Sequence, residues 1–160
     1  YMSTISHYGE LSLTNKKDVV IKKNPYLEMS EFGWTVDPIG LRITLRQLYD
    51  RYEMPIYIVE NGFGYDDQVN QNGEIIDDYR IDYMRKHIEQ MKLAIDEGVD
   101  CRGYLSWGPI DILSSRAQMK KRYGFVYVNR DNKDLKDMKR IKKKSFEWFK
   151  HVIETNGEEL

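Results

Sequence analysis

Two short apolar runs end abruptly in polar residues, and they predict the strands of the chain. The run at 56–59 is rich in β-branched residues, and Glu60 follows where the strand gives way to a loop. The run at 101–107 likewise ends in polar and aromatic groups. Continuous apolar runs of this length are typical of strands that are buried on both faces, as in parallel sheets. We therefore predict a fully buried strand at 56–59 and a second strand at 101–107.

Between and around these strands, apolar residues recur at helical spacing. Asp37 followed by Pro38 supplies an N-cap and a proline at the first helical position, which predicts a helix over 38–53. A longer helix is expected from Asp77 or Asp78 up to Gly98. Its apolar stripe consists of Ile81, Met84, Ile88, Met91 and Ile95. A hairpin edge at 123–128 and a last helix over about 137–155 complete the expected elements.

This alternation of strand and helix predicts right-handed βα units around a parallel sheet. Periodicity alone allows either a doubly wound sheet or part of a barrel. In both architectures ligands bind outside the carboxyl ends of the strands. The polar residues that follow the two strands are therefore expected to lie at one edge, where a site can form.

Composition narrows the classes of partner. The 160 residues are 41% hydrophobic and carry a net charge of −1, so we expect neither a nucleic-acid nor a membrane partner. Cys101 is the single cysteine, which favours the reducing cytoplasm and a buried, inert thiol. The histidines at 7, 87 and 151 show no metal-ligand spacing and are expected on the surface. The lysines and arginines at 139–144 are interpreted as a solvated helix face.

The polar stretches carry a family resemblance. The sequence Ile-Val-Glu-Asn-Gly at 58–62 resembles the nucleophile motif of retaining β-glycosidases of glycoside hydrolase family 1. Ser114 and the sequence Lys-Arg-Tyr-Gly at 121–124 resemble the phosphate-recognition loop of its 6-phospho-β-glucosidase and 6-phospho-β-galactosidase branch. The resemblance covers essentially the whole chain. It implies an α/β fold, the C-terminal portion of a (β/α)8 TIM barrel, in which the two predicted strands are the last two.

The same resemblance implies how the chain is organised as a domain. Residues 1–160 are expected to be the C-terminal third of a bacterial 6-phospho-β-glucosidase, a single barrel segment without an internal boundary. The family's Asn-Glu acid/base motif has no counterpart among them. We therefore expect this piece alone to be inactive, and to be marginally stable or to self-associate over its open sheet edges.

Two residues are expected to act on the sugar. Retaining glycosidases use two carboxyl groups about 5–5.5 Å apart, one of which attacks the anomeric carbon. The resemblance assigns that catalytic role to Glu60, although Glu-Asn-Gly after a strand is also compatible with a simple turn. It assigns Trp107 as a platform for the apolar face of the sugar, the alternative being a core aromatic. Asp111 is expected to fix the loop, and Trp34 to pack or to lie at the rim.

Three residues are expected to bind a sugar 6-phosphate, which carries about −1.5 to −2 charge at neutral pH. Lys121 supplies a cation, while Tyr123 and Ser114 supply hydroxyl donors. In an extended segment Lys121 and Tyr123 point the same way, so Arg122 faces away. Lys-Lys-Arg-Tyr is also compatible with a solvated basic turn, and Ser115 is an alternative to Ser114.

The resulting hypothesis is a glycosidase that cleaves phosphorylated β-disaccharides or aryl 6-phospho-β-glucosides by double displacement. The resemblance implies no metal and no organic cofactor. The alternative is a catalytically inactive fragment or a non-catalytic module that binds sugar phosphate. Gluco- versus galacto- preference and the aglycone stay open.

Overall fold

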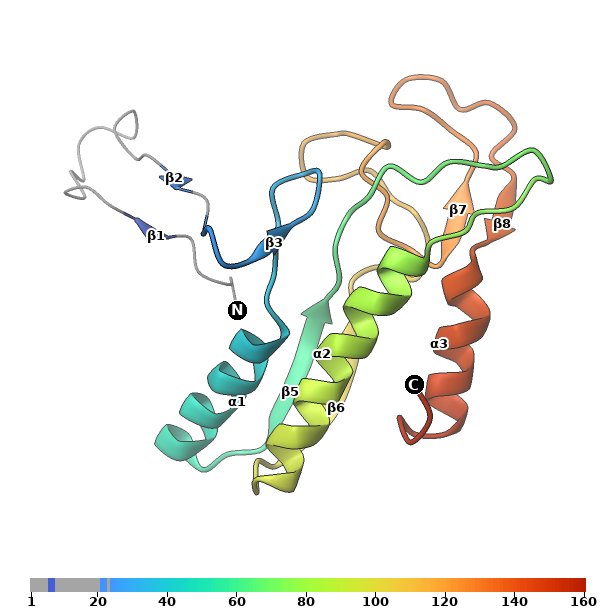
Figure 1. Cartoon of the computed structure of the whole chain (residues 1–160). Coiled ribbons are helices and arrows are strands. Elements are labelled where there is room, and N and C mark those ends of the chain that lie inside the picture. Colours follow the sequence, from blue (N-terminus) through green and yellow to red (C-terminus); the bar gives the residue numbers. More distant parts are fainter. Residues whose placement is uncertain (1–5, 8–20, 23) are drawn as a thin grey trace.

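A computed structural model describes residues 6–7, 21–22 and 24–160. Two short antiparallel pairs come first, β1 (Ser6–His7) with β2 (Ile21–Lys22) and β3 (Glu28–Met29) with β4 (Thr35–Val36). They precede α1 (Pro38–Tyr52), β5 (Ile56–Asn61), α2 (Asp78–Asp96) and β6 (Cys101–Ser106). Figure 1 shows these elements, followed by β7 (Val126–Val128), β8 (Arg140–Lys142) and α3 (Lys144–Glu154).

The centre of the fold is the parallel pair β5–β6, as the strand–helix–strand rhythm predicts. Helix α1 begins where it was expected, because the Asp37 side chain accepts a hydrogen bond from the Gly40 amide at 2.9 Å. It ends at Tyr52, and the C-cap residue Glu53 has a left-handed φ of 49°. The expected strands at 56–59 and 101–107 and the two helices before and between them are therefore confirmed.

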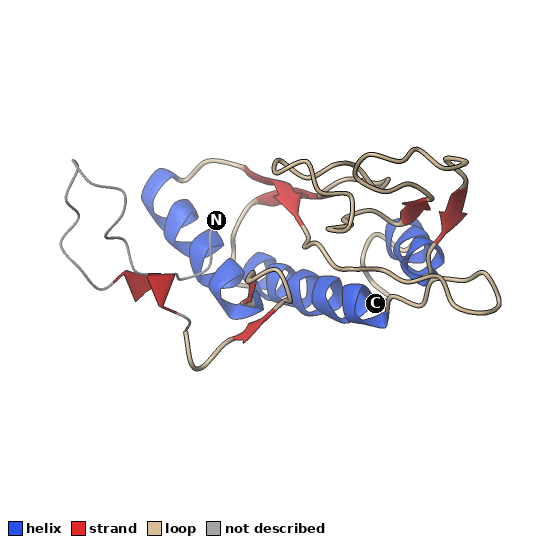
Figure 2. Ribbon diagram, turned by 90° about the horizontal axis from the view of Figure 1, so that it is seen from above, coloured by secondary structure: helices blue, strands red, loops and turns tan. Residues whose placement is uncertain are grey.

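Helices α1 and α2 lie on the same side of the β5–β6 sheet (Figure 2). The core between them contains Leu41 and Leu45 of α1, Ile58 of β5 and Ala94 of α2, with Val99 closing one end. A second cluster lies toward α3. It consists of Phe63, Tyr83, Met84 and Phe125, with Phe146, Trp148 and Phe149 packed against it.

The opposite face of this sheet is open in the described part of the chain. Tyr57, Val59 and Leu105 project from it and are 58%, 72% and 57% exposed. The prediction that 56–59 is fully buried is therefore wrong for this chain. The reason is that α1 and α2 cover one face only, whereas the apolar sequence of the strand suits burial on both.

The C-terminal part differs from the expected helix over 137–155. Residues Arg140–Lys142 instead form β8, which pairs antiparallel with β7, and α3 begins only at Lys144. The hairpin edge is thus confirmed, with its second strand in a segment that was expected to be helical. Pairing with β7 decides the conformation of Ile141, and that contact is not local in sequence.

Side-chain burial corrects two further expectations. His87 is buried at 1% exposure on α2, not on the surface. Its ring lies tilted against Tyr83, with centroids 4.0 Å apart, and its Nδ1 lies 2.7 Å from the Tyr83 carbonyl oxygen. His151 is exposed as expected, and the side chain of His7 lies outside the described residues. Cys101 is half-buried, and burial raises the pKa of its thiol. No helix in the described ranges is long and apolar enough to span a bilayer.

Candidate functional site

The end of β5 presents Glu60 to solvent. Its neighbour Asn61 is buried, and its side-chain oxygen accepts a hydrogen bond from the Tyr104 hydroxyl at 2.6 Å. Tyr83 also bonds to Asn61, and burial raises the pKa of Tyr83 to about 12. The pairing of β5 with β6 shifts register between Ile58 and Asn61, and there Asn61 is buried while Glu60 is exposed. The described residues make no hydrogen bond or ion pair with the Glu60 carboxylate, which leaves it available to a ligand.

Trp107 lies beside this strand end. Its amide donates to the Asn61 carbonyl at 2.7 Å, so the chain after β6 stays in register with the end of β5. The half-buried indole meets the Tyr123 ring edge to face, with centroids 5.9 Å apart and an interplanar angle of 80°. Trp107 is therefore a wall at the edge where the two strands end, rather than part of either core cluster.

Ser114 and Tyr123 contact each other. Both side chains are buried, at 8% and 6% exposure, and they are joined by a hydrogen bond. Burial raises the pKa of Tyr123, and the bond to Ser114 opposes that shift. The Ser114 hydroxyl also accepts from the Gln118 amide at 3.1 Å, which fixes the turn. Ser115 is exposed and has no such contact among the described residues, so the geometry distinguishes the two serines.

Lys121 points to the same side as Tyr123. Its ammonium lies 3.6 Å from the centroid of the Trp34 ring and 5.8 Å from that of Tyr123. Desolvation lowers the pKa of Lys121, and the charge of Arg116 adds to the effect. Trp34 itself is 37% exposed and stacks on Tyr123 at 5.9 Å, so it lies at the rim as one of the two expectations had it.

Arg122 faces the other way, as predicted. Its guanidinium is buried, forms an ion pair with Asp111 at 3.2 Å, and donates to the carbonyl of Val128. Asp111 also accepts from the Gly124 amide at 3.0 Å. The expected role of Asp111 in fixing the loop is confirmed, and the alternation of Lys121, Arg122 and Tyr123 follows from these anchors.

A buried charge network beneath the loop was missed by sequence reasoning. Lys143 is wholly buried and donates to Asp67 at 2.5 Å and to Asp111 at 2.7 Å. Arg80, also buried, pairs with Asp67 at 3.0 Å and Asp77 at 2.9 Å. The interpretation of 139–144 as a solvated face is therefore wrong for Lys143. A lysine within a basic run carries no signal of burial, because its partners lie 32 and 76 residues away.

The network connects the loops that follow β5 and β6. Tyr65 and Arg122 exchange two backbone hydrogen bonds, at 2.9 and 3.0 Å, which pair the two loops directly. Arg80 strengthens the join by donating to the carbonyls of Phe63 and Tyr123. The segment that carries Glu60 and the segment that carries Lys121 are thus held as one unit.

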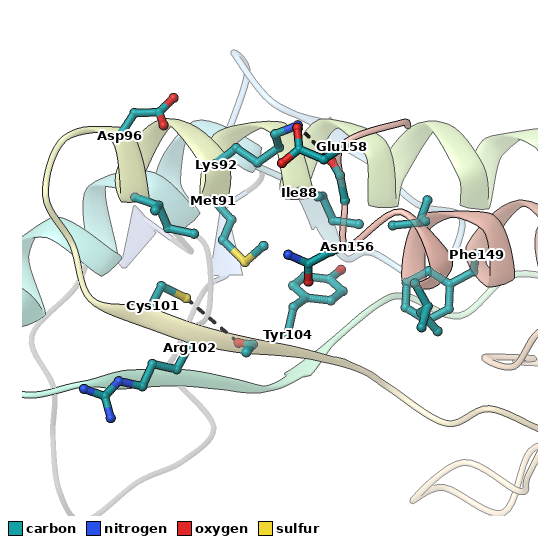
Figure 3. A pocket seen from close by; sticks show the side chains of 15 residues that line it. Ile88, Met91, Lys92, Asp96, Cys101, Arg102, Tyr104, Phe149, Asn156 and Glu158 are labelled. Atoms are coloured by element: carbon teal, nitrogen blue, oxygen red, sulfur yellow. Dashed lines mark hydrogen bonds between the residues drawn. The ribbon is translucent and has the colours of Figure 1, made fainter.

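The structure therefore places the five predicted site residues on the loops and strand ends at one edge of the β5–β6 sheet. A cavity of about 490 Å³ lies elsewhere, between α2, β6 and α3 (Figure 3). Ile88, Met91, Cys101 and Tyr104 line part of it, and none of the five site residues does. The reactive groups at the strand ends are an exposed carboxylate, an aromatic wall, two hydroxyls and an ammonium that has no carboxylate partner among the described residues. The described residues contain no cluster of acidic, histidine or cysteine side chains that could hold a metal.

Comparison with known proteins gives a consistent result. The family Glycosyl hydrolase family 1 matches residues 1–158. The aryl-phospho-beta-D-glucosidase BglH of Bacillus subtilis is 60% identical over 139 residues, which are 86% of this chain and 30% of that protein. A 6-phospho-beta-glucosidase of Dickeya chrysanthemi is 54% identical over 153 residues, which are 95% of this chain and 33% of that protein.

Solved structures of the same family resemble this chain. A family 1 β-glucosidase of Thermotoga maritima aligns with a TM-score of 0.80 and 34% identity, over 92% of this chain and 32% of that one. The expected fold class, a portion of a TIM barrel, is thereby confirmed. The chain spans about a third of the length of the relatives that it matches.

Proposed function

Because the chain belongs to glycosyl hydrolase family 1, we propose that the complete protein carrying these residues hydrolyses 6-phospho-β-glucosides. The observation that carries the proposal is the ammonium of Lys121, which lies beside Tyr123 without a carboxylate partner among the described residues. A phosphate group supplies the missing counter-charge. The names of the relatives, which are phospho-β-glucosidases in Bacillus and Dickeya, support the same substrate class.

In this proposal Glu60 is the nucleophile. Its exposed carboxylate attacks the anomeric carbon of the sugar, the bond to the leaving oxygen breaks, and a covalent glycosyl–enzyme forms that water then hydrolyses. A second carboxyl group about 5–5.5 Å away protonates the leaving oxygen. The family places that group in an Asn-Glu motif, which the 160 residues do not contain.

Trp107 and the phosphate loop orient the substrate for that attack. The indole offers an apolar face to the sugar ring, while Lys121 and the hydroxyls of Ser114 and Tyr123 offer donors to the phosphate. Because the loops after β5 and β6 are bonded to each other, phosphate binding and nucleophile position are mechanically linked. With Cys101 as the single cysteine, a cytoplasmic location belongs to the same proposal.

The test compares p-nitrophenyl 6-phospho-β-glucoside with the unphosphorylated glucoside in the complete protein. Charge-assisted hydrogen bonds contribute about 1.5–3 kcal/mol each, so Lys121→Ala should lower kcat/KM for the phosphorylated substrate about 10- to 100-fold. Lys120→Ala is the matched control, because its exposed ammonium pairs with Asp66 at 2.9 Å and not with the site. Equal kcat/KM for the two substrates in the wild type would refute the phosphate assignment.

A third possible outcome of these assays is binding without hydrolysis. Binding of glucose 6-phosphate without turnover of either substrate would identify a non-catalytic sugar-phosphate module. Isothermal titration of the complete protein with glucose 6-phosphate, alongside the activity assay, separates that outcome from hydrolysis.

A further inference from the structure

The ammonium of Lys121 rests on aromatic rings instead of a carboxylate. The Trp34 ring centroid lies 3.6 Å from its Nζ and the Phe32 centroid 5.5 Å away. The carboxylate of Asp66, in the loop after β5, pairs with Lys120, the residue that precedes Lys121. A ring face attracts a cation without neutralising it, by about 0.5–2 kcal/mol. Lys121 is therefore positioned without a carboxylate counter-charge among the described residues.

Gly64 also contacts the side chain of Lys121, and we call Trp34, Phe32 and Gly64 together the aromatic seat of Lys121. A Cβ atom on Gly64 would overlap Cγ of Lys121, and would lie 2.9 Å from its Cε and 3.1 Å from a ring carbon of Tyr123. Gly64 does not have a left-handed φ, so the position demands glycine for space and not for backbone conformation. The methylene chain of Lys121 thus passes between the Gly64 backbone and the rings.

We propose that Trp34 and Gly64 are positioning residues for phosphate specificity: together they fix the Lys121 ammonium where the phosphate of the substrate meets it. The inference rests on the function proposed above and extends it to two residues that sequence patterns assign only to packing or to a turn. An ion pair at this place would have to break before phosphate could bind. The aromatic seat holds the same ammonium in place without that competition.

The seat also lies between the two functional loops. Gly64 follows Glu60 by four residues, and Trp34 precedes α1, so the position of Lys121 depends on segments outside its own loop. Loss of either contact leaves the charge of Lys121 intact but releases its side chain. The expected effect therefore falls on affinity for the phosphorylated sugar, not on the chemical step.

The experiment measures kcat and KM for both p-nitrophenyl substrates, and Ki for glucose 6-phosphate, in the complete protein. For Trp34→Leu we expect KM for the phosphorylated substrate and Ki to rise about 3- to 30-fold, the strength of a cation–π contact. For the unphosphorylated substrate, kcat and KM should both stay within about twofold of the wild-type values. Trp34→Phe keeps a ring face and should restore most of the affinity.

Gly64→Ala provides a second, independent variant, with an expected loss of affinity of similar size because the added methyl displaces Lys121. Tyr26→Leu is the matched control, since Tyr26 is an aromatic residue of the same N-terminal region that is 92% exposed. Thermal unfolding of every variant identifies any that fail to fold.

The possible results separate the two proposals. A wild type that prefers the phosphorylated substrate, with a preference that Trp34→Leu and Gly64→Ala both leave unchanged, would overturn the seat alone. Equal losses for both substrates would also overturn it, because they indicate a role in sugar binding or packing. A wild type without phosphate preference refutes the function proposed above, and the seat with it.

Discussion

Replacing Lys143 with methionine tests the buried charge network directly. The side chain is wholly buried, and its ammonium donates to Asp67 at 2.5 Å and to Asp111 at 2.7 Å. Three cations, Arg80, Arg122 and Lys143, balance three carboxylates, Asp67, Asp77 and Asp111. Methionine preserves much of the volume but removes one cation, so the carboxylates exceed their counter-charges by one.

The size of the effect follows from burial. Removing one partner of a buried ion pair costs about 3–5 kcal/mol, because the remaining charge stays desolvated. Desolvation already lowers the pKa of Lys143 and raises that of Asp67, so neither charge is held without cost. We therefore expect Lys143→Met to lower the free energy of unfolding by about 3–5 kcal/mol.

The adjacent residue provides the control. Lys144 is 50% exposed and pairs with Asp78, which is 62% exposed, at 2.6 Å. Exposed pairs contribute about 0–1 kcal/mol, so Lys144→Met should have little effect. Chemical denaturation of the complete protein, followed by tryptophan fluorescence, measures both variants. Adding Asp67→Asn to Lys143→Met restores the charge balance and should recover part of the loss.

Equal destabilisation by the two lysine variants would refute this account of the network. So would a double variant whose cost equals the sum of the single costs, because removing both charges of an interacting pair is not additive.

Three other predictions concern pH, catalysis and assembly. Desolvation lowers the pKa of His87 in the folded chain. Below about pH 6.5 the unfolded chain therefore binds a proton at this histidine that the folded chain does not bind. The free energy of unfolding should thus fall as pH drops from about 7 toward 5, and it should fall less steeply in His87→Gln. Glu60→Gln should abolish turnover of phosphorylated and plain substrates alike, and near-normal kcat would assign the nucleophile elsewhere. The 160-residue chain by itself should show no turnover and should self-associate through the open sheet face, where Val59 and Leu105 are exposed. Size-exclusion chromatography checks this, and a monodisperse, stable monomer would contradict it.

Local signals explain why much of the fold could be predicted. The cap at Asp37 and the apolar spacing of α1 and α2 act within a few residues, so the sequence alone indicates both helices. The start of α3 could not be predicted from such local signals. Residues Arg140–Lys142 have no strong preference of their own, and their pairing with β7 makes them a strand.

The candidate site also has features that the sequence predicts and features that it does not. Motif resemblance predicts roles for five residues, and these roles stay predictions: Glu60, Trp107, Ser114, Lys121 and Tyr123. Alternation along the loop correctly predicts that Arg122 points inward. The contact between Lys121 and Trp34 joins residues 87 positions apart, and no periodicity connects them. The burial of Lys143 could not be predicted from the sequence either, because it depends on carboxylates from two other loops.

The inward anchor of Arg122 has an evolutionary consequence. It separates the positions that hold the loop from the position proposed to meet the phosphate, since Arg122 and Asp111 form a buried pair while Lys121 points to the other side. Under the proposed function, substitution of Lys121 should therefore alter phosphate binding at little cost in stability. In that proposal, a protein carrying this loop can change its preference for phosphate at Lys121, while the pair of Arg122 and Asp111 preserves the backbone of the loop.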